Sequence, residues 1–422
     1  MLRSVVIVGG SLAGLTTAEM LRRLGFDGAI VIVGEEVHPP YDRPPLSKQV
    51  LSGQWQPEKA NLRRPEQLTS LGLDFRHGVS ATGVDLADGR LTLSDREQLR
   101  YDALVVATGL RPRRLPMFDG MAGVHVLRTL DDCVALKQDL APGRRVVVIG
   151  AGFLGTEIAS TVRKIGADVT LIDVVSEPLT LQLGPELGRL VADLHLRNGV
   201  QARLGVGVAD ARATNGRVSS IALSDGTRIE TDLVVLAIGT VPATEFLDGS
   251  GLDLAGGLVC DATCRAAANV FAAGDVARWP YPPAGGMVRV ESRTNAVEQA
   301  QVVARNILAR EGESQEYSPI TFGWTDQYDV KIQIYGHRAP ASDFCLLEGS
   351  AEEDKFVGAF RHEGKITAVV GWNSPRALRN YRAVVHADAD PSLAPYRPER
   401  RGADENEALA GLGQAPKVHQ ST

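Results

Sequence analysis

The sequence predicts an α/β fold with two Rossmann-like nucleotide-binding domains. The chain has 422 residues, of which 44% are hydrophobic and 23% are charged, and this is enough to bury more than one core in two or three domains. A buried strand, a glycine-rich turn and a helix follow one another twice, within residues 5–36 and 145–173. This order is typical of βαβ units that bind dinucleotides.

The first unit lacks one glycine of the dinucleotide fingerprint. Gly9 and Gly14 occupy the first and third places, but the middle place is Ser11. We expect the backbone at Ser11 to lie slightly farther from a pyrophosphate, or its hydroxyl to bond to it. Glu35 ends the following strand and has the spacing of an acid that bonds ribose hydroxyls.

The second unit has the complete fingerprint, with Gly150, Gly152 and Gly155, and its second strand ends at Asp173. A carboxylate there bonds a free 2′-hydroxyl and repels a 2′-phosphate. Because no basic residue follows in the segment 174–178, the sequence favours NADH over NADPH. Two such units in one chain indicate two bound dinucleotides.

Three further segments are predicted as strands. Residues 101–109 and 231–239 have similar apolar patterns, and each is expected to close one nucleotide-binding half. Residues 263–275 are expected to form a strand that ends at Gly274 and Asp275. An acid at the carboxyl end of a parallel strand suits the ribityl chain of a flavin, although the same residues also fit an ordinary turn.

Charge and composition exclude several classes of protein. A formal net charge of −6 argues against general nucleic-acid binding. No apolar run approaches the roughly 20 residues that span a bilayer and no signal region is visible, so we expect no membrane association and a cytoplasmic location. The four cysteines are scattered and fit reduced thiols; those at 260 and 264, like His195 and His337, lack the spacing of a metal site.

The chain resembles the FAD-dependent NADH:ferredoxin reductases of glutathione-reductase fold over roughly residues 1–385. The resemblance is carried by the two fingerprints and by PPLSK, LRTLDD, AAGD, VRVESRTNAVEQA and WTDQYD. It implies an FAD-binding domain at 1–111 and 240–320, an NADH-binding domain at 112–239 and a C-terminal α+β domain at 321–400. The composition of residues 401–422 predicts a disordered tail.

The resemblance also implies the residues that bind each cofactor. For FAD they are Gly9, Ser11, Ala13, Gly14, Glu35, Arg43, Lys48, Ala81, Thr108, Gly109, Arg128, Gly274, Asp275 and Arg293. For NADH they are Gly150, Gly152, Leu154, Gly155, Asp173, Ile238 and Gly239.

One implied flavin contact, Arg293, has a structural expectation of its own. It is expected just ahead of a helix at 294–308 that Ser292 or Thr294 caps, with the positive end of the helix toward the flavin. A solvated arginine on a surface helix is the alternative.

Three residues are candidates for catalysis. The resemblance implies that Lys48 and Glu157 form an ion pair over the flavin, with Glu157 also touching the nicotinamide amide. A solvated loop lysine and a surface acid are the alternative. Trp324 is implied at the point where electrons leave, although a tryptophan is more often a core residue.

The proline-rich loop at 39–48 decides between classes of flavoenzyme. A disulfide reductase of this architecture would carry its cysteine pair there, and this loop has none. The sequence therefore predicts transfer of electrons to an external iron–sulfur ferredoxin that serves a cytochrome P-450 or another oxygenase. Alternatives are a rubredoxin reductase, an NADH oxidase and a redox-responsive NADH/FAD-binding protein.

An acidic ferredoxin requires a basic docking surface on its reductase. The candidates are Arg310, Lys331, Arg338, Arg376, Arg379 and Arg382, unless they are scattered and solvated. A monomer or a weak homodimer would both suit the predicted C-terminal domain.

Overall fold

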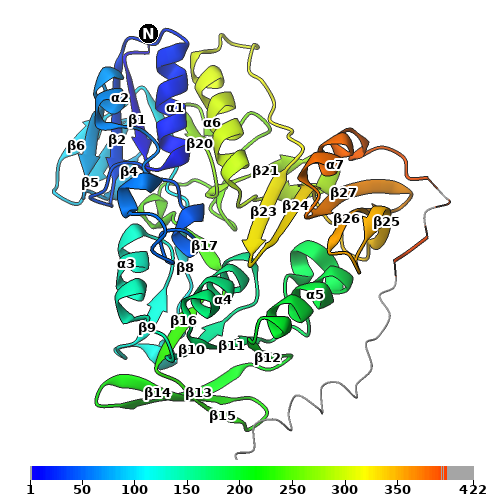
Figure 1. Ribbon diagram of the computed structural model, residues 1–422. Helices are drawn as coiled ribbons and strands as arrows, with labels where there is room; N and C mark the ends of the chain where they lie inside the picture. The colour runs from blue at the N-terminus through cyan, green and yellow to red at the C-terminus, as the bar shows by residue number, and fades with distance from the viewer. Residues whose placement is uncertain (1, 391, 393, 397–422) are drawn as a thin grey trace, which may run out of the picture.

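The structure is a computed structural model that describes residues 2–390, 392 and 394–396. The tail predicted at 401–422 lies outside the described residues. Three large sheets of six, five and five strands organise the described chain, and Figure 1 shows them as three adjoining parts. Both nucleotide-binding folds and the α+β part are present, so the predicted fold class is confirmed.

The first sheet contains the first fingerprint. Its strands β1, β2, β3, β7 and β20 are parallel, and β19 is antiparallel to β20. Helices α1 and α6 pack side by side along one face (Figure 1). The bounds are β1 Ser4–Val8, α1 Leu12–Arg23, β2 Ala29–Gly34, β3 Asp74–His77, β7 Ala103–Val106, β19 Arg265–Ala267, β20 Val270–Ala272 and α6 Arg293–Leu308.

Two local predictions for the first sheet and the helix α6 are wrong. Residues 263–275 form a hairpin of two short strands, β19 and β20, and not one strand. Helix α6 begins at Arg293, which is therefore part of its first turn. Ser292 occupies the N-cap position without a side-chain capping bond, because its hydroxyl donates 2.5 Å to the carbonyl of Phe322.

The second sheet is parallel throughout, in the order β12-β11-β10-β16-β9. Helix α4 follows the glycine turn after β10. A small antiparallel sheet, β13-β14-β15, lies below the second sheet in Figure 1. The bounds are β9 Val124–Val126, α3 Leu130–Asp139, β10 Arg145–Ile149, α4 Phe153–Ile165, β11 Asp168–Asp173, α5 Thr180–Arg197, β12 Gln201–Leu204, β13 Val208–Thr214, β14 Arg217–Leu223, β15 Arg228–Glu230 and β16 Leu233–Leu236.

The third large sheet is antiparallel, in the order β23-β24-β27-β26-β25. Helix α5 of the second part packs against it, because Leu183, Leu187 and Val191 share one buried cluster with Ile332 and Trp372. The bounds are β23 Phe322–Gln327, β24 Val330–Gly336, β25 Asp343–Ser350, β26 Lys355–His362, β27 Lys365–Trp372 and α7 Pro375–Asn380.

The chain passes between the first and second sheets along a two-stranded antiparallel ribbon. It consists of β8 (Leu110–Pro112) and β17 (Thr240–Pro242). Further elements are β4 Ala81–Asp85, β5 Arg90–Leu93, β6 Gln98–Arg100, β18 Leu258–Val259, β21 Ala277–Tyr281, β22 Gly286–Val288, the helix α2 Pro65–Ser70 and the short 3-10 helix η1 Pro44–Ser47, which contacts α3 and α4.

Candidate active site

A large cavity of about 1270 Å³ is lined by residues of all three large sheets or their loops. It collects residues that the sequence predicted from distant segments: Ser11, Ala13, Arg43, Lys48, Thr108, Gly109, Arg128, Gly274, Asp275 and Arg293, and also Gly150, Gly152, Leu154, Glu157, Asp173, Ile238, Gly239 and Trp324. Most of the predicted FAD and NADH residues therefore face one common space.

A second cavity of about 600 Å³ adjoins the first and shares Ser11, Thr108 and Arg128 with it. Its own walls include three further predicted residues, Gly9, Glu35 and Ala81. Together the two cavities form a long space at the carboxyl ends of the parallel strands, where open α/β sheets bind their ligands.

Two predicted glycines, Gly14 and Gly155, line neither cavity. A Cβ atom at Gly14 would lie 2.0 Å from the carbonyl oxygen of Gly9, and one at Gly155 would lie 1.8 Å from that of Gly150. These glycines let each helix pack closely on its own turn. These glycines therefore contribute to dinucleotide binding by setting the position of the helix, and they do not contact the cavity themselves.

Ser11, in place of the middle glycine, is the N-cap residue of α1, and its side chain makes no capping bond. Because the residue lines both cavities, its hydroxyl is placed where it could bond a phosphate. This fits the second of the two sequence expectations for Ser11.

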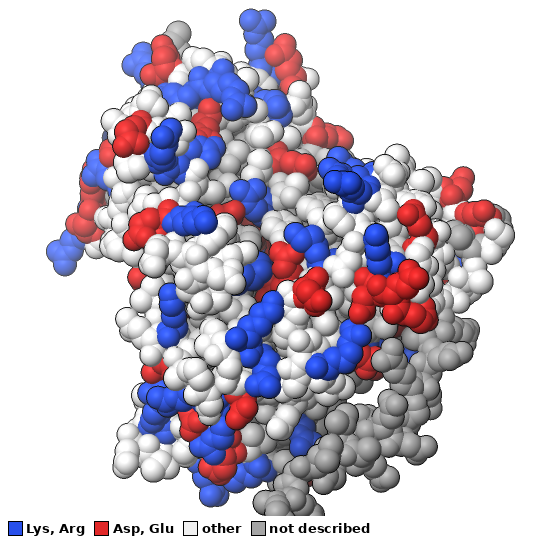
Figure 2. Space-filling view, in the orientation of Figure 1, with Lys and Arg blue, Asp and Glu red and all other residues white. Residues whose placement is uncertain are grey.

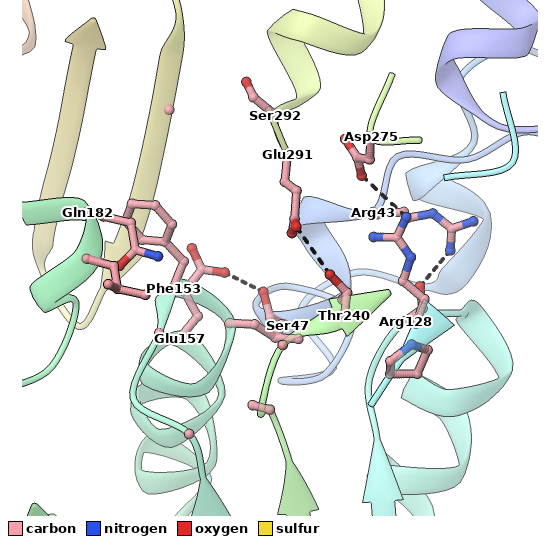
Figure 3. A pocket seen from close by; sticks show the side chains of 18 of the residues that line it. Arg43, Ser47, Arg128, Phe153, Glu157, Gln182, Thr240, Asp275, Glu291 and Ser292 are labelled. Atoms are coloured by element: carbon pink, nitrogen blue, oxygen red, sulfur yellow. Dashed lines mark hydrogen bonds and ion pairs between the residues drawn. The ribbon is translucent and has the colours of Figure 1, made fainter. Parts of the chain in front are cut away.

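Two arginines test whether the cavity fits FAD. Arg43 donates to the carbonyl of Arg128 at 2.6 Å and pairs with Glu36 at 2.7 Å, while Arg128 reaches Asp275 at 3.4 Å. Burial and the charge of Arg43 lower the pKa of Arg128, whose buried Nε has no hydrogen-bond partner among the described residues. Figure 3 shows both arginines facing the cavity. This concentration of cationic donors fits the pyrophosphate of a dinucleotide.

Asp275 lines the same cavity. Burial raises the pKa of its carboxyl, and the charge of Arg128 opposes this shift. Gln299 of α6 accepts a hydrogen bond from the amide of the neighbouring Gly274 at 2.8 Å, which holds the strand end in place. Sequence reasoning did not predict Gln299, because a glutamine inside a helix gives no chemical signal.

The two predicted ribose acids already have partners from the chain. Glu35 forms two bonds of 3.0 Å with Arg111, and Arg111 also reaches Glu245 at 2.8 Å. Asp173 accepts from the amides of Ala151 at 2.6 Å and Val175 at 3.1 Å. Asp173 thus closes the second glycine turn as well as lining the cavity. The sequence did not indicate either arrangement.

The predicted ion pair between Lys48 and Glu157 forms, with Nζ and Oε2 2.7 Å apart. Glu157 is only 7% exposed and also accepts from Ser47 at 2.6 Å, from Thr325 at 3.0 Å and from the amide of Asp326 at 3.3 Å. The alternative of a solvated lysine and a surface acid is therefore excluded. Sequence reasoning missed Ser47 and Thr325, which are buried beside it.

Trp324 lines the large cavity and stacks on Phe322, with ring centres 5.9 Å apart. Arg293, at the start of α6, pairs with Asp42 at 2.9 Å. Glu291 accepts from Thr240 of the ribbon at 3.2 Å, as Figure 3 shows. These contacts join the loop before α6 to the other walls of the cavity.

The four cysteines and His195 are buried in the fold, whereas His337 lines the large cavity. All four cysteines are described and buried, none of them is in a disulfide, and none lines either cavity. His195 is fully buried and bonds Gln327 at 2.9 Å, and His337 lies in the cavity wall. No metal-ligating cluster and no helix long and apolar enough for a membrane occurs within residues 2–390, 392 and 394–396.

Two family models match the chain. Residues 3–300 match the pyridine nucleotide-disulphide oxidoreductases, and residues 322–400 match the reductase C-terminal domain. Rhodocoxin reductase of Rhodococcus erythropolis is 36% identical over 88% of this chain and 87% of its own. Putidaredoxin reductase CamA of Pseudomonas putida is 32% identical over 99% of both chains.

The structural comparison agrees with the sequence comparison. The reductase in the crystal structure of the covalent putidaredoxin reductase–putidaredoxin complex has a TM-score of 0.87 and 30% identity, over 98% of this chain and 99% of that one. The relatives and the site geometry together imply FAD and NAD(H) as cofactors. This chain therefore belongs to the pyridine nucleotide-disulphide oxidoreductase family, among the ferredoxin reductases.

Proposed function

We propose that the protein is an NADH-dependent ferredoxin reductase that passes single electrons to an iron–sulfur ferredoxin of a cytochrome P-450 or another oxygenase system. The observation that carries the proposal is the buried Lys48–Glu157 ion pair, which lies where a disulfide reductase would have its thiols. All four cysteines lie away from both cavities. Without a thiol pair to accept two electrons, an external one-electron carrier is the best acceptor.

Bound FAD and NADH supply the redox chemistry, in which a hydride passes from nicotinamide to flavin. The protein binds and orients the two groups. Arg43 and Arg128 would hold the phosphates of FAD, and Asp275 its ribityl hydroxyls. The N-terminus of α4 at Gly152 would receive the phosphates of NADH.

Lys48 has the role of a fixed positive charge in the cavity wall. Glu157 holds its ammonium group in one place, so the charge needs no reorganisation when negative charge develops nearby. Asp173, with no basic residue after it in the segment 174–178, favours the free 2′-hydroxyl of NADH. Trp324 would form the wall on the side where electrons leave.

Three exposed arginines support a docking surface for an acidic ferredoxin. Arg376 and Arg379 belong to α7, and Arg382 follows it. Figure 2 shows basic side chains gathered at the position of α7. Of the other candidates, Lys331 pairs with Asp326 at 3.2 Å and Arg338 lines the cavity. Arg310 is exposed, but it follows the end of α6 and not α7. We therefore assign the docking role to the three arginines at α7.

Stopped-flow reduction by NADH and by NADPH, followed by titration with purified ferredoxins, tests the function. We expect fast flavin reduction by NADH, slow reduction by NADPH, and cytochrome c reduction that needs added ferredoxin. Higher salt should slow the ferredoxin step, because surface charges are screened. Substitution of Arg376, Arg379 and Arg382 by glutamine should raise the KM for ferredoxin without altering the rate of reduction by NADH.

Other outcomes would replace the proposal. Rapid NADH consumption with oxygen and no carrier would indicate an NADH oxidase. Rapid turnover with rubredoxin alone would indicate a rubredoxin reductase. Slow reduction together with a change of oligomeric state would indicate a redox-responsive binding protein. Equal rates with both nucleotides would contradict the role of Asp173.

We extend the proposal to organisation and location. Four cysteines without a disulfide fit a reducing compartment, which supports the cytoplasm. The ribbon of β8 and β17 supports domain boundaries near 111 and 240, and the start of the reductase C-terminal match at 322 supports one near 320. Sedimentation of the purified protein should show a monomer or a weak homodimer.

A further inference from the structure

The carboxylate of Glu157 joins three parts of the protein, and its two oxygens have different partners. Oε2 accepts from Ser47 Oγ at 2.6 Å and from Lys48 Nζ at 2.7 Å. Oε1 accepts from Thr325 Oγ1 at 3.0 Å and from the amide of Asp326 at 3.3 Å. The first pair belongs to the proline-rich loop, and the second belongs to β23. Figure 3 shows Ser47 pointing at the carboxylate.

These bonds lie in a place with little water. Ser47 is 3% exposed and Thr325 is fully buried. Charge-assisted hydrogen bonds are stronger than neutral ones, and a buried carboxylate loses much if a donor is removed. The carboxylate therefore fixes the relative positions of the loop and of β23.

The Oε1 side sets the position of Trp324. Successive residues of a strand point to opposite faces, so Thr325 faces α4 while Trp324 lines the cavity. Two further contacts to α4 lie farther along the chain. Gln327, the last residue of the strand, donates to Thr156 at 2.8 Å, and the amide of Tyr328, which follows the strand, donates to Ser160 at 2.7 Å. Of these three residues, Thr325 is the one next to Trp324 in the chain, so its bond to Glu157 bears most directly on the position of the tryptophan.

The Oε2 side sets the position of Lys48. Ser47 and Lys48 are adjacent, and Thr161 of α4 also donates to the carbonyl of Ser47 at 2.7 Å. Glu157 of α4 thus binds Lys48 through Oε2 and the strand of Trp324 through Oε1.

We propose that the two oxygens of Glu157 serve the two half-reactions separately. Ser47 positions Lys48 for reduction by NADH, and Thr325 positions Trp324 for electron transfer to the acceptor. Both are positioning residues, and the inference rests on the proposed function. It predicts that the two half-reactions respond differently when one oxygen or the other loses its hydroxyl donor.

The test compares Thr325→Val with Ser47→Ala in the FAD-loaded protein. Two rates are measured, flavin reduction by NADH and reoxidation by ferredoxin. Thr325→Val should slow reoxidation about tenfold more than reduction, and Ser47→Ala should show the reverse, since each removes one hydrogen bond to a buried charge. Thr325→Ser, which keeps the donor, should restore the ratio of the wild type.

The matched control is Ser160→Ala. It removes a buried contact between α4 and the strand region without touching Glu157, so the ratio of the two rates should stay that of the wild type. Thr325→Ala is measured beside Thr325→Val, so that a packing defect specific to valine is recognised. Equal slowing of both rates by Thr325→Val, Thr325→Ala and Ser47→Ala would overturn the inference.

A second readout needs no cofactor. The chain has four tryptophans, so the FAD-free protein labelled with 5-fluorotryptophan should give four ¹⁹F resonances, and Trp324→Phe assigns one of them. Thr325→Val should shift or broaden that resonance, while Ser47→Ala should leave it in place. An unmoved resonance would overturn the inference even if ferredoxin is the acceptor. If the wild type reduces no ferredoxin but the resonance moves as expected, the proposed acceptor is wrong and the positioning role stands.

Discussion

The two arginines at the joined cavities show how single residues prepare a site for an anion. Arg43 and Arg128 lie in contact, and Asp275 and Glu36 are the acids that pair with them. Burial and the neighbouring Arg43 lower the pKa of Arg128. The negative charge of a bound pyrophosphate would offset the repulsion between the two arginines. In the FAD-free protein this repulsion lowers the stability of the fold.

We predict that Arg128→Met weakens FAD binding at least about tenfold, because it removes charged hydrogen bonds. The FAD-free variant should be about as stable as the FAD-free wild type, because lower repulsion offsets the lost bond to Asp275. Equilibrium dialysis with FAD and thermal unfolding measure the two effects. The exposed Arg100→Met is the control, and an equal loss of affinity there would contradict the prediction.

His195 is the second case at this scale, and it makes stability depend on pH. Burial lowers the pKa of His195 to about 4 from 6.5. The neutral ring therefore stabilises the fold fully above about pH 6.5, and this contribution falls as the pH approaches 4. Between pH 7.5 and pH 5 the wild type should lose about 2 kcal/mol more than His195→Gln. Urea unfolding of both proteins at the two pH values checks this, and parallel losses would contradict it.

At the residue scale, the sequence predicted a contact where two motifs indicated it. Lys48 and Glu157 belong to two such motifs, and the structure brings them together. Ser47 and Thr325 were missed because serine and threonine occur everywhere in proteins. Their burial against one carboxylate depends on segments far apart in the sequence.

At the scale of elements, different glycines of the second turn serve helix packing and ligand binding. A Cβ atom at Gly155 would lie 1.8 Å from a backbone oxygen, whereas one at Gly152 would meet nothing within 4 Å. Gly152 lines the cavity and Gly155 does not. The same fingerprint therefore contains one glycine for the ligand and one for the helix.

We predict opposite outcomes for two alanine substitutions in this turn. Gly155→Ala should destabilise the protein by about 1–3 kcal/mol, because overpacking forces α4 away from its turn. Gly152→Ala should keep the stability of the wild type and raise the Kd for NADH. Thermal unfolding and NADH titration distinguish them, and equal losses of stability would be inconsistent with the turn geometry.

The two wrong predictions at this scale have different causes. The segment Ala266–Ala268 before Asn269 gives neither a clear strand pattern nor a turn signal, so the hairpin of β19 and β20 was read as one strand. The start of α6 was predicted one residue late, because Thr294 also resembles a capping residue. Ser292 occupies the N-cap position, but its hydroxyl bonds the carbonyl of Phe322. That partner comes from another sheet and is invisible in the local sequence.

At the scale of the whole molecule, separate cores support one shared cavity. The first sheet has its own apolar cluster, while α5 and the C-terminal sheet share another. All four cysteines are buried. Cys260 and Cys264 belong to the cluster of the first sheet, and Cys133 belongs to a cluster of the second sheet. Burial raises the pKa of Cys264 to about 12 and that of Cys133 to about 11.

We predict that no cysteine reacts quickly with a thiol reagent at pH 8 in the native protein, because thiolate is the reactive form and access is blocked. All four should react in guanidinium chloride. A thiol titration with and without the denaturant measures both states. Fast reaction of one thiol under native conditions would show that its part of the molecule opens alone, and Cys133→Ser and Cys264→Ser would identify it.

The sequence by itself determined the two nucleotide folds, the cofactors and the absence of a thiol pair from the loop at 39–48. These follow from short patterns whose chemistry is local: glycines in a turn, an acid after a strand, a loop without cysteine. Only the tertiary structure decided that Glu157 binds both Lys48 and the strand of Trp324, and that Arg111 holds Glu35. Such contacts join residues far apart in the chain, and burial gives them their strength.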